Sequence, residues 1–215
     1  MRVFIKTLAV TLAAVIIVAA VSAYRPVVDA GHGGFDGGAV AADGTVESEL
    51  NLQIARRLEY MLYLLGYQPV MVRSDESALA DGDTIRAAKS ADLKRRVEIA
   101  DSTEDGFLIS IHQNSFGDSR YGGAQTFWSH EEAKALAELI QFTIRTQIDS
   151  ENERAAKTVP QDVYLFKQTV RPAVLIECGF LTNTQDLERL GSEEYQLRLA
   201  CVIAGCFACF DRNNE

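Results

Sequence analysis

Four polar residues in this 215-residue chain are candidates for chemistry, because each adjoins a segment that reads as a buried strand or the start of a helix. They are two histidines and two glutamates: His32, Glu47, His112 and Glu177. Two histidines and one carboxylate form the ligand set of a catalytic zinc site that keeps a fourth position open for water. A second carboxylate nearby can accept a proton from that water. The set indicates metal-assisted hydrolysis if the fold brings the residues together.

Each of these residues also has an ordinary structural explanation. A lone histidine after a strand more often satisfies a hydrogen bond than binds a metal, and Glu47 is explained as a negative charge at a helix N-terminus. Glu177 is harder to explain, because it follows the apolar run 173–176, which reads as buried on both faces. A carboxylate there needs a partner.

Other catalytic motifs are missing from the sequence. His130 begins His-Glu-Glu-Ala-Lys, so Lys134 occupies the position where HExxH requires its second histidine. No GxSxG serine elbow occurs, and the glycines around His32 do not match GxGxxG. Three of the four cysteines lie in the apolar run 199–210, which favours packing over disulfides or metal binding, although both alternatives stay open.

The elements that must position the candidates alternate between strand-like and helix-like segments. This order predicts an α/β fold with a largely parallel twisted sheet, helices on both faces and a single catalytic domain, residues 24–215. Such sheets collect ligands beyond the carboxyl ends of their strands. Strands are expected at 27–29, 68–73, 107–112, 124–128, 163–166 and 173–176. Helices are expected at 48–65, 92–100, 129 to about 148 (opened by a Ser129–Glu132 capping box) and 192–210, with a surface excursion at 74–91.

Residues 1–23 have the composition of an export segment. Arg2 and Lys6 precede an almost continuous apolar run, 8–21, and Val-Ser-Ala at 21–23 resembles a signal-peptidase site. The run is long for a cleaved signal and short for a bilayer span of about 20 residues, so a signal peptide and a retained membrane anchor both stay open. Both alternatives place the domain outside the cytoplasm.

The overall composition excludes several classes of protein. With 47% hydrophobic and 24% charged residues, the chain is an ordinary globular one, neither disordered nor collagen-like. Its net charge of −9 makes nucleic acid an unsuitable partner, because binding phosphates requires an excess of lysine and arginine.

Four sequence blocks, taken in order, resemble the zinc-dependent N-acetylmuramoyl-L-alanine amidases of the amidase_3 type. The blocks are the glycine-rich segment 29–39 (DAGHGGFDGGA), Glu47, the segment 109–115 (ISIHQNS) and the segment 172–183 (PAVLIECGFLTN). The resemblance runs from about residue 27 to residue 210. The segments 121–127 and 162–167 further look like the germination-specific branch of spore-forming bacteria.

This resemblance implies a role for each candidate. His32, Glu47 and His112 would bind Zn²⁺, and Glu177 would be the catalytic carboxylate that takes a proton from water and passes it to the leaving amine. The bond cleaved would be the amide between the lactyl group of N-acetylmuramic acid and L-alanine in peptidoglycan.

The resemblance also suggests supporting residues. Asp29 or Asn114 would orient the ligand histidines through hydrogen bonds, and Arg96 would be structural or lie beside the substrate. Asp101 stands where the family often has asparagine.

The germination-specific branch implies a biological setting. The enzyme would act on spore cortex, where its product feeds muramic δ-lactam formation, and some relatives in this branch need a partner lipoprotein. Three alternatives stay open: a zinc peptidase acting within the stem peptide, a glycosidase using Glu47 and Glu177, and a catalytically silent wall-binding protein.

Overall fold

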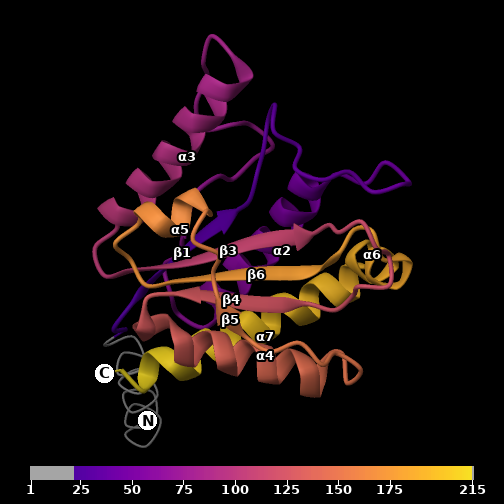
Figure 1. Cartoon of the computed structure of the whole chain (residues 1–215). Coiled ribbons are helices and arrows are strands. Elements are labelled where there is room, and N and C mark those ends of the chain that lie inside the picture. The colour runs from indigo at the N-terminus through magenta and orange to yellow at the C-terminus, as the bar shows by residue number, and fades with distance from the viewer. Residues whose placement is uncertain (1–21, 215) are drawn as a thin grey trace, which may run out of the picture.

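The computed structural model describes residues 22–214, so nearly all of the expected export segment 1–23 lies outside the described residues. A six-stranded sheet crosses the molecule, with helices on both of its faces (Figure 1). The expected α/β fold with a largely parallel sheet is confirmed. In the order β2-β1-β3-β6-β4-β5, the strands are Val70–Met71, Arg25–Ala30, Gly106–Asn114, Ala173–Phe180, Gln125–Ser129 and Lys157–Thr158.

The first four strands of this order are parallel, whereas β4 runs antiparallel to β6 and β5 runs parallel to β4. The central pair, β3 and β6, continues past the predicted strand ends because the two strands pair with each other as far as Asn114 and Phe180. In this register His112 lies directly opposite Glu177, and the pairing becomes irregular just beyond.

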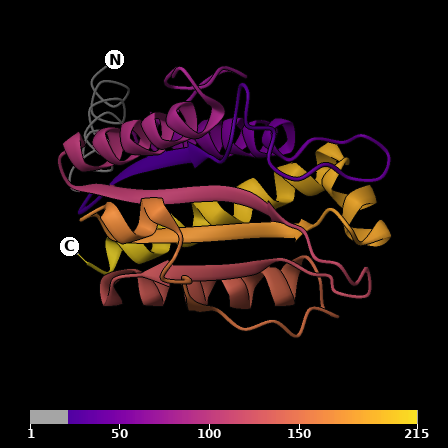
Figure 2. The same cartoon turned by 45° about the horizontal axis from the view of Figure 1, so that its top comes forward.

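Three long helices cover one face of the sheet: α2 (Glu47–Leu64), α4 (Lys134–Gln147) and α7 (Glu193–Arg212). Figure 2 shows α7 and α4 on the side of the sheet away from α3. These three helices and alternate residues of the strands form a large apolar core, in which Phe107 and Phe207 are fully buried. Gly66 ends the α2 segment at a φ of 92°, as its stop position predicted.

The opposite face carries a smaller apolar cluster beneath α3 (Ile85–Ser102) and the short α5 (Tyr164–Gln168). Val27, Leu108 and Leu175 belong to this cluster. Side chains alternate along a strand, so the polar residues two and four positions further on point to the same face. Asp29, Ser110, His112 and Glu177 therefore lie on the α3 side of the sheet.

The strand predicted at 163–166 is wrong, because these residues enter the helix α5. A four-residue apolar run cannot distinguish a strand from one turn of helix by its pattern. Leu165 and Phe166 are neighbours, yet both are buried against the same cluster, which a strand would not allow.

The capping box predicted at Ser129 does not form. Ser129 is the last residue of β4, and its hydroxyl contacts the ring of His130, which has a φ of 60° and lies exposed. The helical segment instead starts with a short 3₁₀ turn, Glu131–Ala133, that leads into α4. Two further helical stretches were not expected: α3 begins at Ile85, inside the predicted surface excursion, and α6 spans Thr184–Leu190.

All four cysteines are free in the described structure. Cys178 and Cys206 are buried and Cys201 and Cys209 are exposed, so only the first two pack in the apolar core. Among residues 22–214, no helix combines the length and the apolar character needed to cross a membrane.

Candidate metal centre and active site

Three of the four candidate side chains converge at the carboxyl ends of β1 and β3. His32 follows β1, Glu47 is the first residue of α2, and His112 lies in β3. Glu47 Oε1 is 3.3 Å from His32 Nε2 and 3.0 Å from His112 Nδ1. One ligand atom from each residue can be chosen so that all three lie within 4.8 Å of one another.

The three candidate ligand side chains can lie this close together because neighbouring backbone positions are glycine and carry no side chain. His32 itself has a φ of 60°, an uncommon value for a residue with a Cβ. A Cβ at Gly31 would overlap the imidazole of His112, and a Cβ at Gly38 (φ 71°) would meet the carboxylate of Glu47. The glycines therefore leave space for the ligand side chains.

Glu47 is held as an anion by several donors. The backbone N–H groups of Ala39 and Gln113 donate to its two oxygens, at 2.9 and 3.2 Å. Burial alone would raise the pKa of Glu47, but the hydrogen bonds and charges of His112 and His32 outweigh it and lower this pKa far below the usual range. An ionised carboxylate beside two imidazoles suits a divalent cation.

Glu177 lies beside this group and is held differently. It faces His112 across the β3–β6 pair, and its Oε2 atom is buried without a hydrogen-bond partner among residues 22–214. Burial raises the pKa of Glu177, and the nearby charge of Glu47 raises it further. A buried carboxylate with a raised pKa beside a possible metal site is suited to accept and return a proton.

Two buried arginines fix the loop that carries His32. Arg73 donates to the carbonyls of Ala30, Gly31 and Ser48, so it ties the loop to the start of α2. Burial lowers the pKa of Arg73 to about 10, which leaves it charged at neutral pH. Its contacts join the backbones next to His32 and Glu47.

Arg96 of α3 performs a similar task from the other side. It donates to the carbonyls of Ala30 and His32 and forms buried ion pairs with Asp29 and Asp92. The contacts are structural, in line with one of the two roles expected for this arginine.

The expected roles of Asp29 and Asn114 differ from what the structure contains. The carboxylate of Asp29 is occupied by Arg96 and by the hydroxyl of Ser110, at 2.7 Å, and forms no hydrogen bond to a histidine. The side chain of Asn114 likewise has no hydrogen bond to His32 or His112 among the described residues; its backbone carbonyl accepts from Leu181. Arg96, for which the sequence predicted no particular partner, forms the ion pair with Asp29 instead.

Two further residues contact the candidate ligands and were not predicted from the sequence. Asp36 Oδ2 lies 3.0 Å from His32 Nδ1, and Asn51 Nδ2 lies 3.4 Å from Glu47 Oε1 and 3.1 Å from the carbonyl of Gly31. Both stand four residues after a candidate ligand. For Asn51, this spacing on the first helix was the signal that could have identified it.

The donor set fits zinc. Two imidazoles and one carboxylate supply the nitrogen and oxygen ligands that zinc takes in catalytic sites, and the orphaned Glu177 oxygen lies on the same side of the sheet. The side chains of His32 and His112 are 20% and 24% exposed, so water and substrate can reach the centre. This possible metal site lies at the carboxyl ends of the strands of a mostly parallel α/β sheet, where enzymes with such sheets bind their ligands.

The comparisons with known proteins define the family. The model of the family Amidase_3, described as N-acetylmuramoyl-L-alanine amidase, matches residues 27–206. The chain belongs to this family and is an N-acetylmuramoyl-L-alanine amidase, with peptidoglycan as its substrate.

Individual relatives agree in sequence and in fold. The germination-specific N-acetylmuramoyl-L-alanine amidase of Bacillus subtilis (strain 168) is 32% identical over 179 residues, 81% of this chain and 74% of the relative. The CwlD amidase from Clostridioides difficile, solved in complex with the GerS lipoprotein, is 35% identical with a TM-score of 0.83 and covers 87% of this chain and 98% of its own. The catalytic domain of CwlV from Bacillus (Paenibacillus) polymyxa var. colistinus is 29% identical with a TM-score of 0.74, over 87% and 97% of the two chains.

Proposed function

We propose that this amidase is zinc-dependent and that His32, Glu47 and His112 hold the ion. The observation that carries the proposal is the convergence of these three side chains around a carboxylate kept ionised by its neighbours. When bound, zinc makes a water molecule more acidic and stabilises negative charge on the carbonyl oxygen under attack.

Glu177 is the acid–base residue in this proposal. Its partnerless Oε2 is free to accept a proton from the attacking water, and its raised pKa lets the protonated carboxyl return that proton to the leaving amine of L-alanine. Glu47 cannot share this task, because its oxygens are engaged by two histidines and two backbone N–H groups. The products are a lactyl carboxylate on the muramic acid and a stem peptide with a free L-alanine amino group.

We further propose that the enzyme is exported and acts on spore cortex, where its product feeds muramic δ-lactam formation. Support comes from the likeness to the germination-specific amidase of Bacillus subtilis, and from the apolar segment that precedes the domain. Deleting the gene should remove δ-lactam from the cortex of the source organism. Normal δ-lactam in spores of the deletion strain would overturn this setting and leave the amidase activity unaffected.

An activating lipoprotein is part of the same proposal. The CwlD amidase, which is similar over nearly its whole length, was solved in complex with the GerS lipoprotein. We expect the purified domain to gain activity when a lipoprotein from the same operon or spore stage is added, and equal activity with and without it would contradict this.

Mass spectrometry of digested peptidoglycan tests the reaction itself. The proposal predicts new L-alanine amino termini and intact glycan strands. Cleavage between later residues of the stem peptide would indicate a peptidase, new reducing sugar ends would indicate a glycosidase, and no cleavage at all would indicate a silent wall-binding protein.

A further inference from the structure

The last turn of α2 exposes a group of large apolar side chains. Tyr60, Tyr63 and Leu64 share one face of the helix, at the spacing i, i+3 and i+4, and Leu65 follows directly. Leu64 is 78% exposed and Leu65 is 45% exposed. We call these four residues the α2 tip. Large apolar side chains that are exposed together, rather than singly, mark a site of interaction.

The α2 tip lies where the chain enters the domain. The buried carboxylate of Asp211, in α7, accepts a hydrogen bond from the backbone N–H of Tyr24, at 2.8 Å, and another from the hydroxyl of Tyr67, at 2.9 Å. Arg25 Nε donates to the carbonyl of Gln68 at 3.0 Å. The beginning of the domain is therefore fixed against the turn that directly follows the α2 tip.

The sequence that precedes this contact is apolar. The run 8–21 ends directly before Ser22, the first residue that the structure describes. A bilayer that holds this run has its surface close to the α2 tip, and tyrosine and leucine side chains are favourable at the level of the lipid headgroups. The neighbouring turn contains the exposed Glu104 and Asp105, so lipids without net negative charge suit this surface best.

The candidate metal centre lies at the opposite end of the molecule. Glu47 is the first of the 18 residues of α2, so the helix alone separates it from the α2 tip by about 27 Å. In Figure 1 the start of β1 and the end of α7 lie together at one end, and the arrowheads of β3 and β6 point away from them. A bilayer at the α2 tip therefore leaves the metal centre facing away from the lipid.

We propose that the α2 tip lies on the outer surface of the membrane that retains the run 8–21, and that this contact points the metal centre toward the peptidoglycan. The proposal rests on the export proposed above and does not depend on the zinc chemistry. It also selects one of the two fates of the export segment. The segment stays on the chain as an anchor, because a released domain would leave the α2 tip in water.

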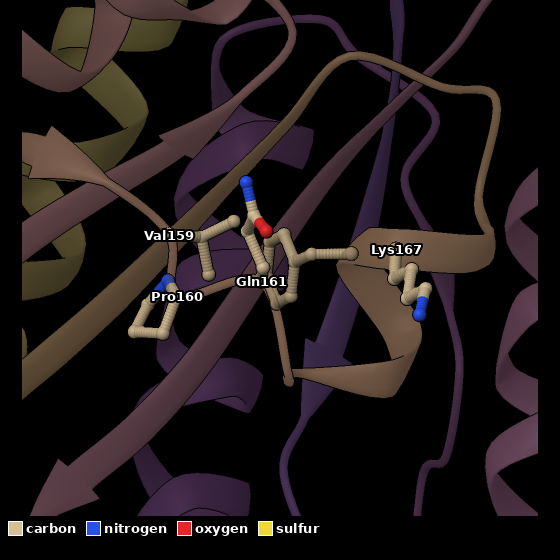
Figure 3. A pocket seen from close by; sticks show the side chains of 5 residues that line it. Val159, Pro160, Gln161 and Lys167 are labelled. Atoms are coloured by element: carbon tan, nitrogen blue, oxygen red, sulfur yellow. The ribbon is translucent and has the colours of Figure 1, made fainter.

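A cavity of about 260 Å³ offers a second apolar surface and is less suitable. Val159, Pro160 and Phe166 supply its apolar walls, and Figure 3 shows Gln161 and Lys167 beside them. Within residues 22–214, none of these side chains hydrogen-bonds to the start of β1. The cavity therefore has no connection to the end of the molecule at which the chain enters.

Tryptophan fluorescence of the full-length chain in phosphatidylcholine vesicles tests the proposal. The chain has one tryptophan, so Trp128→Phe provides a background in which a single new tryptophan reports its own surroundings. Leu64→Trp places the probe in the α2 tip. Ile85→Trp is the matched control, because Ile85 is 77% exposed and begins α3, at the end of that helix remote from the start of β3.

We expect Leu64→Trp to lose about half of its emission when the lipid carries bromine in the upper part of its acyl chains, because bromine quenches a tryptophan at headgroup level. Its emission maximum should also shift to shorter wavelength. Ile85→Trp should keep its emission and its maximum. Tyr63→Trp is a second probe of the same surface and should respond as Leu64→Trp does.

Equal quenching of Leu64→Trp and Ile85→Trp would overturn the proposal. A shift of Leu64→Trp without quenching would overturn it as well, since a protein surface, such as a second copy of the chain, would then cover the α2 tip. Recovery of the protein from the source organism as a chain that begins at Tyr24 would also overturn it. Quenching needs no turnover, so loss of amidase activity on soluble muramyl peptides in the same vesicles would reject the proposed reaction and leave the membrane contact standing.

Discussion

The two faces of the sheet are built for different tasks. The face under α2, α4 and α7 is a continuous apolar core, whereas the face under α3 and α5 has a small apolar cluster and a buried polar layer. In that layer Arg73 and Arg96 donate hydrogen bonds to backbone carbonyls of the segment that carries His32, and Asp29 pairs with Arg96. Substitutions on the first face should therefore change stability alone, whereas substitutions on the second should change the chemistry, the zinc affinity or the buried ion pairs.

Glu177→Gln should have the largest effect. The amide keeps the size of the carboxylate but cannot accept or return a proton, so we expect activity to fall about 100- to 10,000-fold. Zinc content and thermal stability should stay close to those of the wild type, because Glu177 is no ligand in this account. Turnover assays with soluble muramyl peptides and metal analysis measure both, with the exposed Glu194→Gln as control. Near-normal turnover would refute the role of Glu177.

Phe207→Ala tests the apolar face. Phe207 is fully buried and packs edge-on against Tyr67 and Phe107, at centroid distances of 5.2 and 5.7 Å. Removing its ring should lower the free energy of unfolding by about 3–5 kcal/mol, as measured by urea denaturation. Zinc affinity of the folded fraction should not change. The exposed Phe142→Ala should be nearly neutral, and a loss of zinc affinity in Phe207→Ala would break the comparison between the faces.

Asp29→Asn sharpens the comparison, because here the polar face contributes to stability. Burial raises the pKa of Asp29, but the positive charge of Arg96 and the hydrogen bonds to the carboxylate outweigh burial. The folded pKa of Asp29 therefore lies below the unfolded value of about 3.9. Its stabilisation is complete above the unfolded pKa and is lost as pH falls through the folded pKa. The variant leaves Arg96 partly uncompensated and should lose about 3 kcal/mol near neutral pH.

The pH dependence of the unfolding free energy tests whether the Asp29–Arg96 ion pair stabilises the fold. The difference in unfolding free energy between wild type and Asp29→Asn should shrink below about pH 4, because Asp29 of the unfolded wild type binds a proton there while Asp29 of the folded protein keeps its charge. Asp81→Asn, at an exposed aspartate, is the control and should show no such change. A constant difference down to pH 2 would mean that the ion pair does not stabilise the fold.

Arg73→Met should have a smaller effect than Glu177→Gln, Phe207→Ala or Asp29→Asn. Methionine cannot donate the hydrogen bonds by which Arg73 joins the carbonyls of Gly31 and Ser48. The segments that carry His32 and Glu47 should therefore lose their alignment. We expect zinc affinity to fall about 10- to 100-fold, the usual cost of losing an outer partner of a metal site. Competition with a fluorescent chelator measures it, and the exposed Arg95→Met serves as control. Unchanged affinity would show that the loop aligns without Arg73.

The sequence predicted the long elements and not the short ones. The helices at 48–65 and 192–210 were visible because their apolar periodicity extends over several turns. The run 163–166 has no such length, and its helical state depends on packing against the smaller cluster. The full extent of β3 and β6 was also hidden, since it depends on their pairing with each other.

The sequence also predicted only part of the candidate site. The four chemical residues could be selected from type and position, but their supporting contacts could not. Asp29 was expected beside a histidine and instead pairs with Arg96, which lies 67 residues further along the chain. The roles of Asp36 and Arg73 depend on how the loops after β1 and β2 approach each other, which no local pattern encodes.

Metal dependence is the most direct test of the central proposal that His32, Glu47 and His112 jointly hold one zinc ion. Zinc content and amidase activity should be measured on the wild type before chelation, after exhaustive chelation and after zinc is restored, alongside His112→Ala. The account predicts one zinc per chain with full activity, loss of both on chelation, recovery of both with zinc, and neither in His112→Ala. Full activity in the exhaustively chelated wild type, or stoichiometric tight zinc binding by His112→Ala, would contradict it.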